Sequence, residues 1–404
     1  MRPDVTLISL YPRAGRRHDG DSGVSSYTGN LAHALADAGA EVCVIAPELE
    51  GEPAIGTDGP VTVLRSFRTG VPGAVPAALR AADRTGGPVV HLQHELFLYS
   101  GASGLPATMA AIGARGRRRE QALVVTMHQV VRPDAIDRSY TRMHRIKVPA
   151  VAARTAIGAV QTMLPRIADS VIVHEPAFTD IVRGAVHIPH GIELPSTPTG
   201  SREDLRHRLG VDDGRTLALC FGFLAPYKGI ETALQAVRPI ADDVHLVVAG
   251  GEHPRLAAQG DDYAAGLAAE YGAVATFTGF VPDDSVADWF RAADVALQCY
   301  PEPHASSGPL ALALAHDTPV LLSARLADVV GAPPELRVEG PAAEWTRRLA
   351  SLAADPAQLT SLAAASAAFA GDRSWPSVAR RHLELYREVS VGVPSDPAAD
   401  VPVA

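Results

Sequence analysis

The sequence predicts an α/β protein with two Rossmann-like, doubly wound domains, and three observations lead to this class. Short apolar runs alternate with amphipathic helical stretches along the whole chain. The runs are apolar at most positions, as strands buried on both faces of a parallel sheet require. The length of 404 residues is too great for one comfortable hydrophobic core, so two domains of about 200 residues are expected.

The predicted strands are short and lie in both halves of the chain. They cover residues 5–10, 41–45, 89–93, 123–127, 171–173, 186–188, 217–221, 244–248, 275–277, 295–298 and 319–322. Helical periodicity lies between them. One predicted helix face combines Val24, Tyr27, Leu31 and Leu35, and another combines Ile230, Ala233, Leu234 and Val237.

A stretch rich in Pro, Thr, Ser and Gly, residues 194–201, separates the two halves and is interpreted as a linker. The predicted domains are therefore residues 1–195 and 196–372. Residues 373–390 are predicted to form a further amphipathic helix. Residues 391–404 lack periodicity and are predicted to be a loose tail.

Composition restricts the classes of function. Hydrophobic residues make up 47% and charged residues 20%, which is typical of a soluble globular protein. A formal charge of −9 argues against a nucleic-acid partner. No apolar run reaches the ~18 residues of a membrane span, and the first residues look like a strand rather than a signal peptide. A cytoplasmic location without stable membrane insertion is therefore expected.

Two smaller features have simple interpretations. Cys43, Cys220 and Cys299 are widely spaced, and each lies in an apolar run, so we expect buried free thiols rather than disulfides or metal ligands. The basic cluster at residues 115–119 favours a solvated loop, with a membrane-surface or anionic-acceptor patch as the alternative.

Polar residues follow several predicted strands, where ligands of open α/β sheets bind. After the strand at 217–221, Lys228 and Gly229 stand at a predicted helix start. A lysine there, beside a glycine that permits close backbone approach, suits an anionic ligand. The alternative is a lysine whose stem packs on the helix.

The stretch Ser306-Ser307-Gly308-Pro309 follows another predicted strand. Its composition is that of a helix cap, with serine before the helix and proline in the first turn. The same turn can hold a phosphate through its free N–H groups and hydroxyls. A Gly-rich loop with Gly20 and Gly23 follows the first strand and is a weaker signal of the same kind, because it lacks the spacing of a dinucleotide fingerprint.

Histidines stand at the ends of two predicted strands in the first half. His94 and Glu95 follow the strand at 89–93, and His128 follows the strand at 123–127. A structural role and a catalytic or substrate-binding role are both open for them. No histidine pair has the helical spacing of a zinc site, so no metal is expected.

The order of these pieces resembles the retaining glycosyltransferases of family 4, which have the GT-B fold of two Rossmann-like domains facing a central cleft. The resemblance runs from about residue 5 to residue 388. It is carried by the loop at 20–23, the helix and strand around 31–45, Thr126-Met127-His128, Ile188-Pro189-His190-Gly191, and the stretches 221–229, 247–252, 278–282, 293–294 and 308–319.

The resemblance implies a nucleotide-sugar donor held mainly by the second domain and an acceptor bound mainly by the first. Lys228 and His128 match the residues implied to act in catalysis. The residues implied to contact the donor are Gly20, Gly23, Phe223, Lys228, Glu252, His304, Ser306, Ser307, Gly308, Pro309 and Leu310. The resemblance implies that His128 lies near the donor sugar, and His94, Glu95 and His128 are predicted to bind substrate.

The chain departs from the family pattern at three positions. Phe223 stands where an arginine is common in the family. His304 and Leu312 stand where the family commonly has a pair of glutamates that hold the donor sugar and the ribose. Leu312 cannot bind ribose hydroxyls, whereas His304, or Glu302 two residues earlier, can substitute for the first glutamate. The base and the sugar of the donor are therefore the least defined part of the implied function.

The expected function is retaining transfer of a sugar from a nucleoside diphosphate of UDP or GDP type to a small or polyhydroxylated acceptor. The implied front-face mechanism uses no metal, no bound cofactor and no protein nucleophile. Two alternatives remain: an enzyme that uses an unusual activated sugar or a sugar phosphate, and a catalytically silent sugar-binding protein of the same fold. The oligomeric state stays open.

Overall fold

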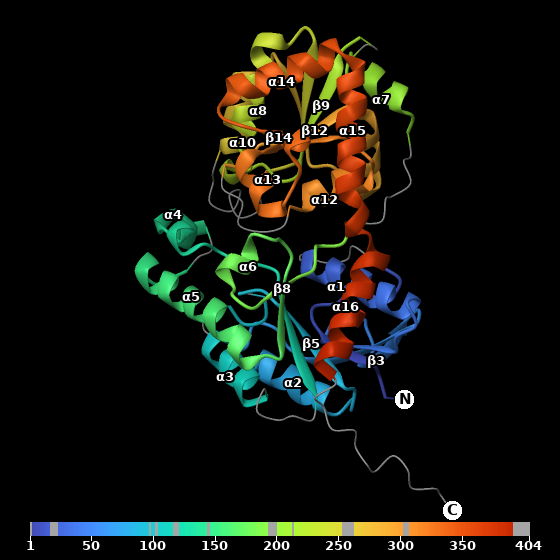
Figure 1. The fold of residues 1–404 in the computed structure, drawn as a ribbon, viewed down its shortest axis with the longest axis vertical. Helices are drawn as coiled ribbons and strands as arrows, with labels where there is room; N and C mark the ends of the chain where they lie inside the picture. Colours follow the sequence, from blue (N-terminus) through green and yellow to red (C-terminus); the bar gives the residue numbers. More distant parts are fainter. Residues whose placement is uncertain are drawn as a thin grey trace, which may run out of the picture. The chain divides into compact units, whose positions relative to one another are not determined.

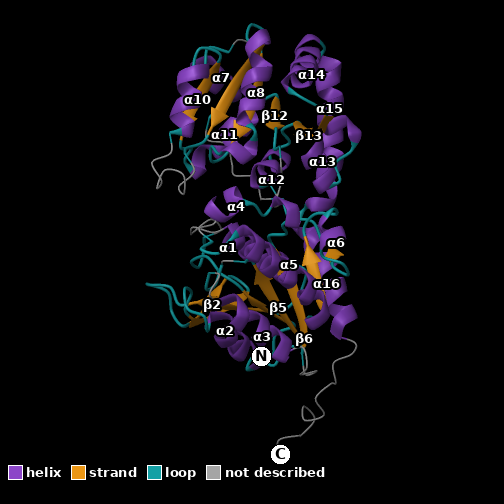
Figure 2. Ribbon diagram, turned by 90° about the vertical axis from the view of Figure 1, so that its left-hand side faces the viewer, coloured by secondary structure: helices purple, strands orange, loops and turns teal. Residues whose placement is uncertain are grey.

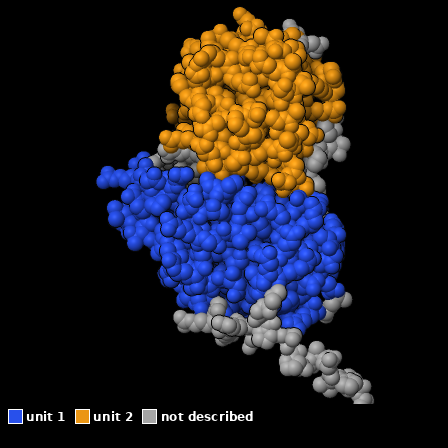
Figure 3. All heavy atoms as spheres, viewed as in Figure 1, with its two compact units in different colours: residues 1–191, 375–404 blue, residues 192–374 orange. Residues whose placement is uncertain are grey.

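The chain forms two compact units in the computed structural model. The structure describes residues 2–16, 23–96, 98–101, 104–115, 121–143, 146–192, 200–211, 214–252, 262–301 and 307–390. Unit 1 combines Met1–Gly191 with Trp375–Ala404, and unit 2 is Ile192–Ser374 (Figure 3). The last helix of the chain thus belongs to the first unit.

Unit 1 contains an eight-stranded sheet in the order β3-β4-β2-β1-β5-β6-β7-β8. Every pairing is parallel except that of β3 with β4. The strands are β1 (Val5–Ile8), β2 (Val42–Pro47), β3 (Ile55–Asp58), β4 (Val61–Phe67), β5 (Val89–His94), β6 (Ala122–Met127), β7 (Ser170–Val173) and β8 (Val186–His187). The helices are α1 (Gly23–Asp37), α2 (Ala74–Asp83), α3 (Leu105–Arg115), α4 (Arg138–Met143), α5 (Ala150–Ile167), α6 (Phe178–Ile181) and α16 (Trp375–Ser390).

Unit 2 contains a six-stranded parallel sheet in the order β11-β10-β9-β12-β13-β14. Its strands are β9 (Thr216–Phe221), β10 (Val244–Ala249), β11 (Ala275–Gly279), β12 (Val295–Gln298), β13 (Val320–Ser323) and β14 (Arg337–Val338). Its helices are α7 (Arg202–Arg208), α8 (Ile230–Val237), α10 (Tyr263–Tyr271), α11 (Val286–Ala292), α12 (Gly308–Ala315), α13 (Ala324–Val330), α14 (Ala342–Ala354) and α15 (Pro356–Ala370). Helices lie on both sides of the strands in each unit (Figure 2).

The core of unit 1 contains residues from both the first and the last helix of the unit. The central strands β1, β5 and β6 are buried at every residue. Leu31 and Leu35 of α1 belong to the same hydrophobic cluster as Trp375 and Leu385 of α16, and the two helices lie side by side (Figure 1). Burying one such side chain contributes about 1.5–3 kcal/mol to the free energy of unfolding. Because α16 buries several of them, it is part of the core of unit 1.

The predicted α/β class is confirmed, and every predicted strand has a counterpart. Three strands were missed, namely β3, β4 and β14. β4 alternates buried and exposed residues, with Val61, Val63 and Phe67 facing inward, whereas the prediction relied on continuous apolar runs. β3 pairs with it as an antiparallel edge strand, and β14 has only two residues. These strands therefore lack the pattern of a strand that is buried on both faces.

Other expectations have mixed outcomes. All three cysteines are free and buried, as predicted. Arg115 is buried and forms an ion pair with Asp83, so it is no part of a solvated loop, and residues 116–120 lie outside the described residues. Most of the predicted linker and all of the predicted tail also lie outside them. Among the described helices, none is long and apolar enough to cross a membrane.

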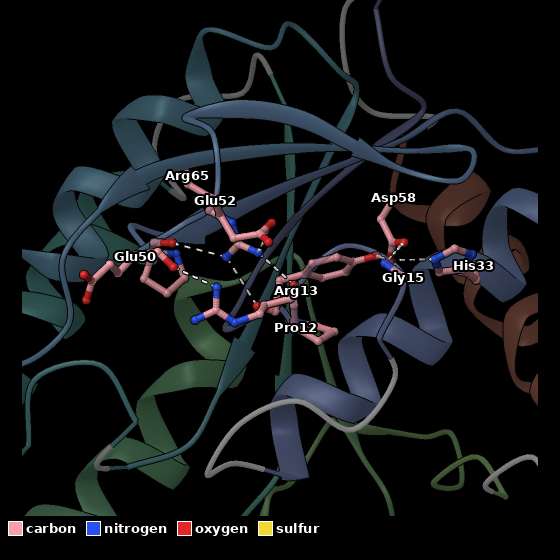
Figure 4. A network of polar contacts seen from close by, with 10 residues as sticks. Pro12, Arg13, Gly15, His33, Glu50, Glu52, Asp58 and Arg65 are labelled. Carbon is pink, nitrogen blue, oxygen red and sulfur yellow. Dashed lines mark hydrogen bonds and ion pairs between the residues drawn. The ribbon is translucent and has the colours of Figure 1, made fainter. Parts of the chain in front are cut away.

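Two buried charges fix the segment that follows β1 (Figure 4). The Arg65 guanidinium on β4 donates hydrogen bonds to the carbonyl oxygens of Pro12 (2.7 Å) and Tyr11 (3.3 Å). Asp58 at the end of β3 accepts hydrogen bonds from the Tyr11 hydroxyl (2.9 Å) and the Gly15 N–H (2.8 Å). The unpredicted hairpin β3–β4 thus holds the start of the loop that leads to Gly20.

Asp58 also lies 3.0 Å from His33 of α1, which completes its set of partners. Burial opposes ionisation of Asp58, but the hydrogen bonds from His33, Gly15 and Tyr11 outweigh it and leave the pKa of the carboxyl below its ordinary value. The ionised carboxylate is therefore the stabilising form.

We expect Asp58→Asn to lower the free energy of unfolding at pH 7 by about 1–3 kcal/mol, because buried donors lose a charged acceptor. The folded-state pKa is lowered, so the contribution is complete above the unfolded value of about 3.9 and is lost as the pH falls through the folded value. Urea unfolding between pH 7 and pH 3 measures this.

Glu48→Gln serves as the control, because the Glu48–Arg68 pair is exposed and exposed ion pairs contribute little to stability. An Asp58→Asn protein as stable as the wild type at pH 7 would contradict the assignment. So would a difference that grows as the pH falls.

Candidate functional site

The loop that follows β9 brings Lys228 back towards the end of that strand. Gly222 has a φ of +100°, which glycine adopts without strain, and its N–H donates to Ala249 at the end of β10. A short 3-10 turn, Pro226–Lys228, follows, and Gly229 (φ +66°) precedes α8. The Lys228 ammonium group donates to the carbonyl oxygen of Phe221, at 3.4 Å.

Three glycines allow this packing because a side chain at each would overlap a neighbour. A Cβ at Gly222 would lie 2.5 Å from Lys228 Nζ and 3.2 Å from Pro309 Cγ. A Cβ at Gly229 would lie 2.1 Å from the carbonyl oxygen of Cys299, and one at Gly250 would lie 2.1 Å from that of Gly222. The loops after β9, β10 and β12 therefore meet around Lys228.

This meeting point is the topological switch of the sheet in unit 2. The chain runs outward from β9 to β10 and β11 and then returns to β12 on the other side of β9. Ligands of open α/β sheets bind outside the carboxyl ends of strands at such a point. The switch point therefore collects Lys228, which follows β9, and the start of α12, which follows β12.

Lys228 is half-buried, and burial lowers the pKa of its ammonium group to about 8. No carboxylate of the described residues forms an ion pair with it. A partly desolvated cation without a counter-ion is unfavourable, and an anionic ligand would supply the missing charge.

The start of α12 offers fewer free N–H groups than its sequence suggests. Ser307 is the N-cap, and its Oγ accepts a hydrogen bond from the N–H of Leu310 (3.2 Å). Tyr300 Oη lies 3.1 Å from the same oxygen. Pro309 has no N–H. In this described turn, the N–H groups of Ser307 and Gly308 remain for a ligand, and the N–H expected from Leu310 is already used.

The other residues predicted for donor binding have varied surroundings. Phe223 is 43% exposed. Glu252 lies beside the loop after β9, because its backbone forms a bridge with Leu224. Gly23 is the first residue of α1 and is exposed. Gly20, His304 and Ser306, with Glu302, lie outside the described residues.

In unit 1 the carboxyl ends of neighbouring strands gather a group of rings. His128 follows β6, His174 follows β7 and His190 follows β8, while Tyr27 comes from α1. Tyr27 lies 4.7 Å from His128, 4.9 Å from His174 and 4.9 Å from His190 between ring centroids. Trp375 of α16 lies 5.3 Å from Tyr27 and completes the group.

Of this group, only His128 was predicted as a site residue from the sequence. His174 was missed, although it directly follows a predicted strand, and that position was the available signal. The Nε2 atom of His174 is buried and has no hydrogen-bond partner among the described residues. The same holds for Tyr27 Oη and Trp375 Nε1, so polar atoms of three elements are available here for water or a ligand.

His94 and His128 are joined through the backbone, because the N–H of His128 donates to the carbonyl oxygen of His94 (2.9 Å). Burial lowers the pKa of the His94 imidazole to about 4. Burial, followed by the nearby His174 and His190, holds the pKa of His128 well below its ordinary value. Both rings are therefore neutral at pH 7. Glu95 is half-buried next to His94.

Within the part of the chain that the structure describes, no three His, Cys, Asp or Glu side chains are placed to hold a metal ion. The expectation of a reaction without a metal stays a prediction.

Two family models match the chain. Residues 22–194 match "Glycosyltransferase Family 4", and residues 201–326 match "Glycosyl transferases group 1". The two matches fall on the sheets of unit 1 and unit 2 respectively.

Similar curated proteins carry one name. A D-inositol 3-phosphate glycosyltransferase of Xylanimonas cellulosilytica is 30% identical over 434 residues, covering 96% of this chain and 97% of the relative. A protein of the same name from Rhodococcus opacus is 33% identical over 218 residues, covering 50% of this chain and 47% of the relative. The match to the Rhodococcus protein thus spans about half of that relative's length.

Solved structures share the fold at low identity. Sucrose-phosphate synthase of Thermosynechococcus elongatus has a TM-score of 0.70 and 22% identity, covering 96% of this chain and 99% of that chain. HepE of Anabaena in complex with UDP-glucose has a TM-score of 0.64 and 15% identity, covering 96% and 100%. The expected GT-B fold class is confirmed, and the chain belongs to the family 4 glycosyltransferases of group 1.

Proposed function

We propose that the protein transfers a sugar, with retention of configuration, from a nucleoside-diphosphate donor to a small polyhydroxylated acceptor. One observation carries the proposal: the half-buried ammonium group of Lys228 stands without a carboxylate among the described residues, beside Gly222 and the start of α12. A diphosphate supplies the charge that this arrangement lacks. Unit 2 is accordingly the donor-binding unit in this proposal.

The chemistry of the donor suits such a site. Transfer breaks the bond between the sugar and the diphosphate, so negative charge develops on the leaving oxygen. Lys228 supplies a positive charge and the Ser307 and Gly308 N–H groups supply donors, all fixed before the reaction. Preorganised donors of this kind are worth about 3–4 kcal/mol each in transition-state stabilisation. Gly222 and Gly308 let the phosphates approach the backbone.

UDP is the first donor nucleotide to test and GDP the second. HepE, which shares the fold, was solved with UDP and with UDP-glucose. The chain has Leu312 on α12 where the family commonly has the glutamate that binds ribose. An alkyl side chain cannot accept a hydrogen bond from ribose hydroxyls, so an unusual donor remains the second candidate.

We assign the acceptor to unit 1, with His128, His94 and Glu95 around it. His128 is neutral at pH 7, and the unprotonated nitrogen of a neutral imidazole can accept a hydrogen bond from a sugar hydroxyl. The leaving phosphate oxygen takes the acceptor proton in this proposal, so no protein nucleophile and no metal are required. The expected cytoplasmic location belongs to the same proposal.

A phosphorylated cyclitol is the first acceptor to test. The Xylanimonas relative that this chain matches along almost its full length is named as a D-inositol 3-phosphate glycosyltransferase. D-inositol 3-phosphate is small and polyhydroxylated, as the proposed acceptor is.

The first prediction concerns the identity of the ligand. We expect UDP, or failing that GDP or ADP, to raise the melting temperature, because a ligand at 100 times its dissociation constant adds about 2.7 kcal/mol. The chain has two lysines, Lys147 and Lys228, which provides a matched control. Lys228→Met should abolish the shift and lower turnover about 100-fold or more, whereas Lys147→Met should change neither.

A shift with sugar phosphates and with none of the nucleotides would favour the unusual donor. No shift with either class, together with no turnover of UDP-glucose and D-inositol 3-phosphate, would favour a sugar-binding protein without catalysis.

The second prediction concerns pH. Because burial lowers the pKa of Lys228 to about 8, the ammonium group loses its proton as the pH rises through that value. Calorimetric affinity for UDP should be nearly constant from pH 7 to 8. Above pH 8 it should fall, by at most about tenfold per pH unit. The second ionisation of a phosphate group, with a pKa of about 6, is largely complete in this range.

In Lys228→Met the affinity should be weak and independent of pH over the same range. An affinity of the wild type that stays constant up to pH 9.5 would remove Lys228 from the phosphate site.

The third prediction separates steric effects on the fold from effects on the ligand. Gly222→Ala forces a side chain onto a positive φ and into Lys228 Nζ, so we expect a loss of about 1–3 kcal/mol in unfolding free energy and weaker UDP binding. At Gly308 a Cβ meets no described atom within 4 Å. Gly308→Ala should therefore change stability by less than about 0.5 kcal/mol while also weakening UDP binding.

Urea unfolding and calorimetry of the two variants measure both effects. If Gly308→Ala binds UDP as tightly as the wild type does, the start of α12 is not a phosphate site.

A further inference from the structure

A buried chain of hydrogen bonds lies behind His128 in unit 1. His128 Nε2 lies 2.8 Å from Gln93 Oε1. Gln93 Nε2 lies 3.2 Å from His91 Nε2, and that nitrogen lies 2.7 Å from Thr126 Oγ1. At the far end, His91 Nδ1 lies 2.6 Å from the hydroxyl of Tyr386. The chain thus runs from His128 through β5 and β6 to α16.

The strand geometry sets these residues together. His91 and Gln93 are two positions apart on β5, so their side chains emerge on the same face of the sheet. Gln93 is the register partner of Thr126 on β6, and His128 follows that strand. His91, Gln93 and Thr126 have no exposed surface, whereas His128 is partly exposed. The chain therefore has one open end, which is the His128 ring.

The amide of Gln93 links the protonation of the two rings. An amide oxygen only accepts and an amide nitrogen only donates. With Oε1 towards His128, the Nε2 atom of His128 must carry the proton. With Nε2 towards His91, the hydrogen bond needs a lone pair on Nε2 of His91, which the Thr126 hydroxyl shares as a second donor. The proton of His91 then sits on Nδ1, facing Tyr386.

Burial keeps both rings neutral, so each carries one proton that must be placed on one nitrogen. The titratable groups that face His128 are Tyr27 from α1, His91 and His94 from β5, His174 after β7 and His190 after β8. Among the described residues, His128 Nδ1 has no hydrogen-bond partner. The tautomer set by Gln93 leaves this atom as an acceptor.

We infer that Gln93 is a positioning residue that holds His128 as the Nε2–H tautomer, so that Nδ1 accepts a hydrogen bond from a substrate hydroxyl. This inference rests on the proposed function, in which His128 contacts the sugar or the acceptor. A ring free to change tautomer would present a donor to that hydroxyl for part of the time and would lose the contact.

The tautomer can be measured without a substrate. In protein labelled with nitrogen-15 histidine, neutral Nε2–H and Nδ1–H rings give different nitrogen shifts. The His128 signals are assigned as those that are lost in His128→Gln. We expect the Nε2–H form in the wild type and a mixture, or the Nδ1–H form, in Gln93→Met.

Gln161→Met is the matched control. Gln161 is also a buried glutamine of unit 1, but it bonds the backbone of Val131 at both ends of its amide (2.8 and 3.0 Å). Its replacement should lower stability without changing the tautomer of His128. An effect of Gln93→Met that the control does not share is thus specific to the His128 contact.

Kinetics with UDP-glucose and D-inositol 3-phosphate test whether the tautomer of His128 matters for sugar transfer. Gln93→Met should lower kcat/KM about tenfold or more, the size of effect seen when a partner that orients a functional histidine is lost. Gln93→Glu keeps an acceptor for Nε2–H and adds a negative charge that raises the pKa of His128. It should recover activity at high pH and lose it towards low pH, giving an acid limb that the wild type lacks.

Each outcome decides the inference. A wild-type His128 in the Nδ1–H form overturns it, and this measurement stands even if Gln93→Met does not fold. An unchanged tautomer in Gln93→Met, or a changed tautomer with unchanged kcat/KM, also overturns it. If the wild type binds no nucleotide and shows no transfer, the proposed function is overturned instead. The tautomer of His128 can still be measured in that protein, so the two failures can be told apart.

Discussion

The arrangement of unit 2 depends on one constraint, the placing of a lysine ammonium group in a partly desolvated position without a carboxylate partner among the described residues. This placement is accompanied by glycine at 222, whose φ of +100° other residues rarely adopt, and by glycine at 229, where a Cβ would overlap the carbonyl oxygen of Cys299 after β12. It also explains the lowered pKa of Lys228. A protein that only needed a stable loop would gain nothing from this arrangement, whereas a protein that binds a diphosphate gains a preorganised charge.

The two units use their strand ends in different ways. The switch point of unit 2 offers a cation and backbone N–H groups, which suit phosphates. The strand ends of unit 1 offer neutral imidazoles and aromatic rings, with a low pKa for His94 and His128 caused mainly by burial. Neutral imidazoles suit the hydroxyl groups of a sugar or cyclitol ring. This difference supports the proposed assignment of the donor to unit 2 and of the acceptor to unit 1.

The sequence was sufficient for the strands that are buried on both faces and for the residues that follow them, because both follow from local pattern. It failed for β4, whose alternation marks a strand near the sheet edge, and hence for the network of Asp58 and Arg65. Residues whose role depends on contacts across the fold were also beyond its reach. Gln93 is an ordinary strand residue until His91 and His128 are seen on either side of its amide. The Leu310 N–H looked free until the Ser307 hydroxyl was seen to occupy it.

Carbon-13 NMR of protein with labelled lysine measures the charge of Lys228 directly. Lys147 and Lys228 are the two lysines, so each signal is identified with one substitution. We expect the Lys228 signal to titrate near pH 8 and to shift to a higher titration point when UDP is added, while the Lys147 signal does not respond to UDP. A Lys228 signal that titrates at the ordinary value of about 10.4 and does not respond to the nucleotide would show that Lys228 is neither desolvated nor part of a phosphate site.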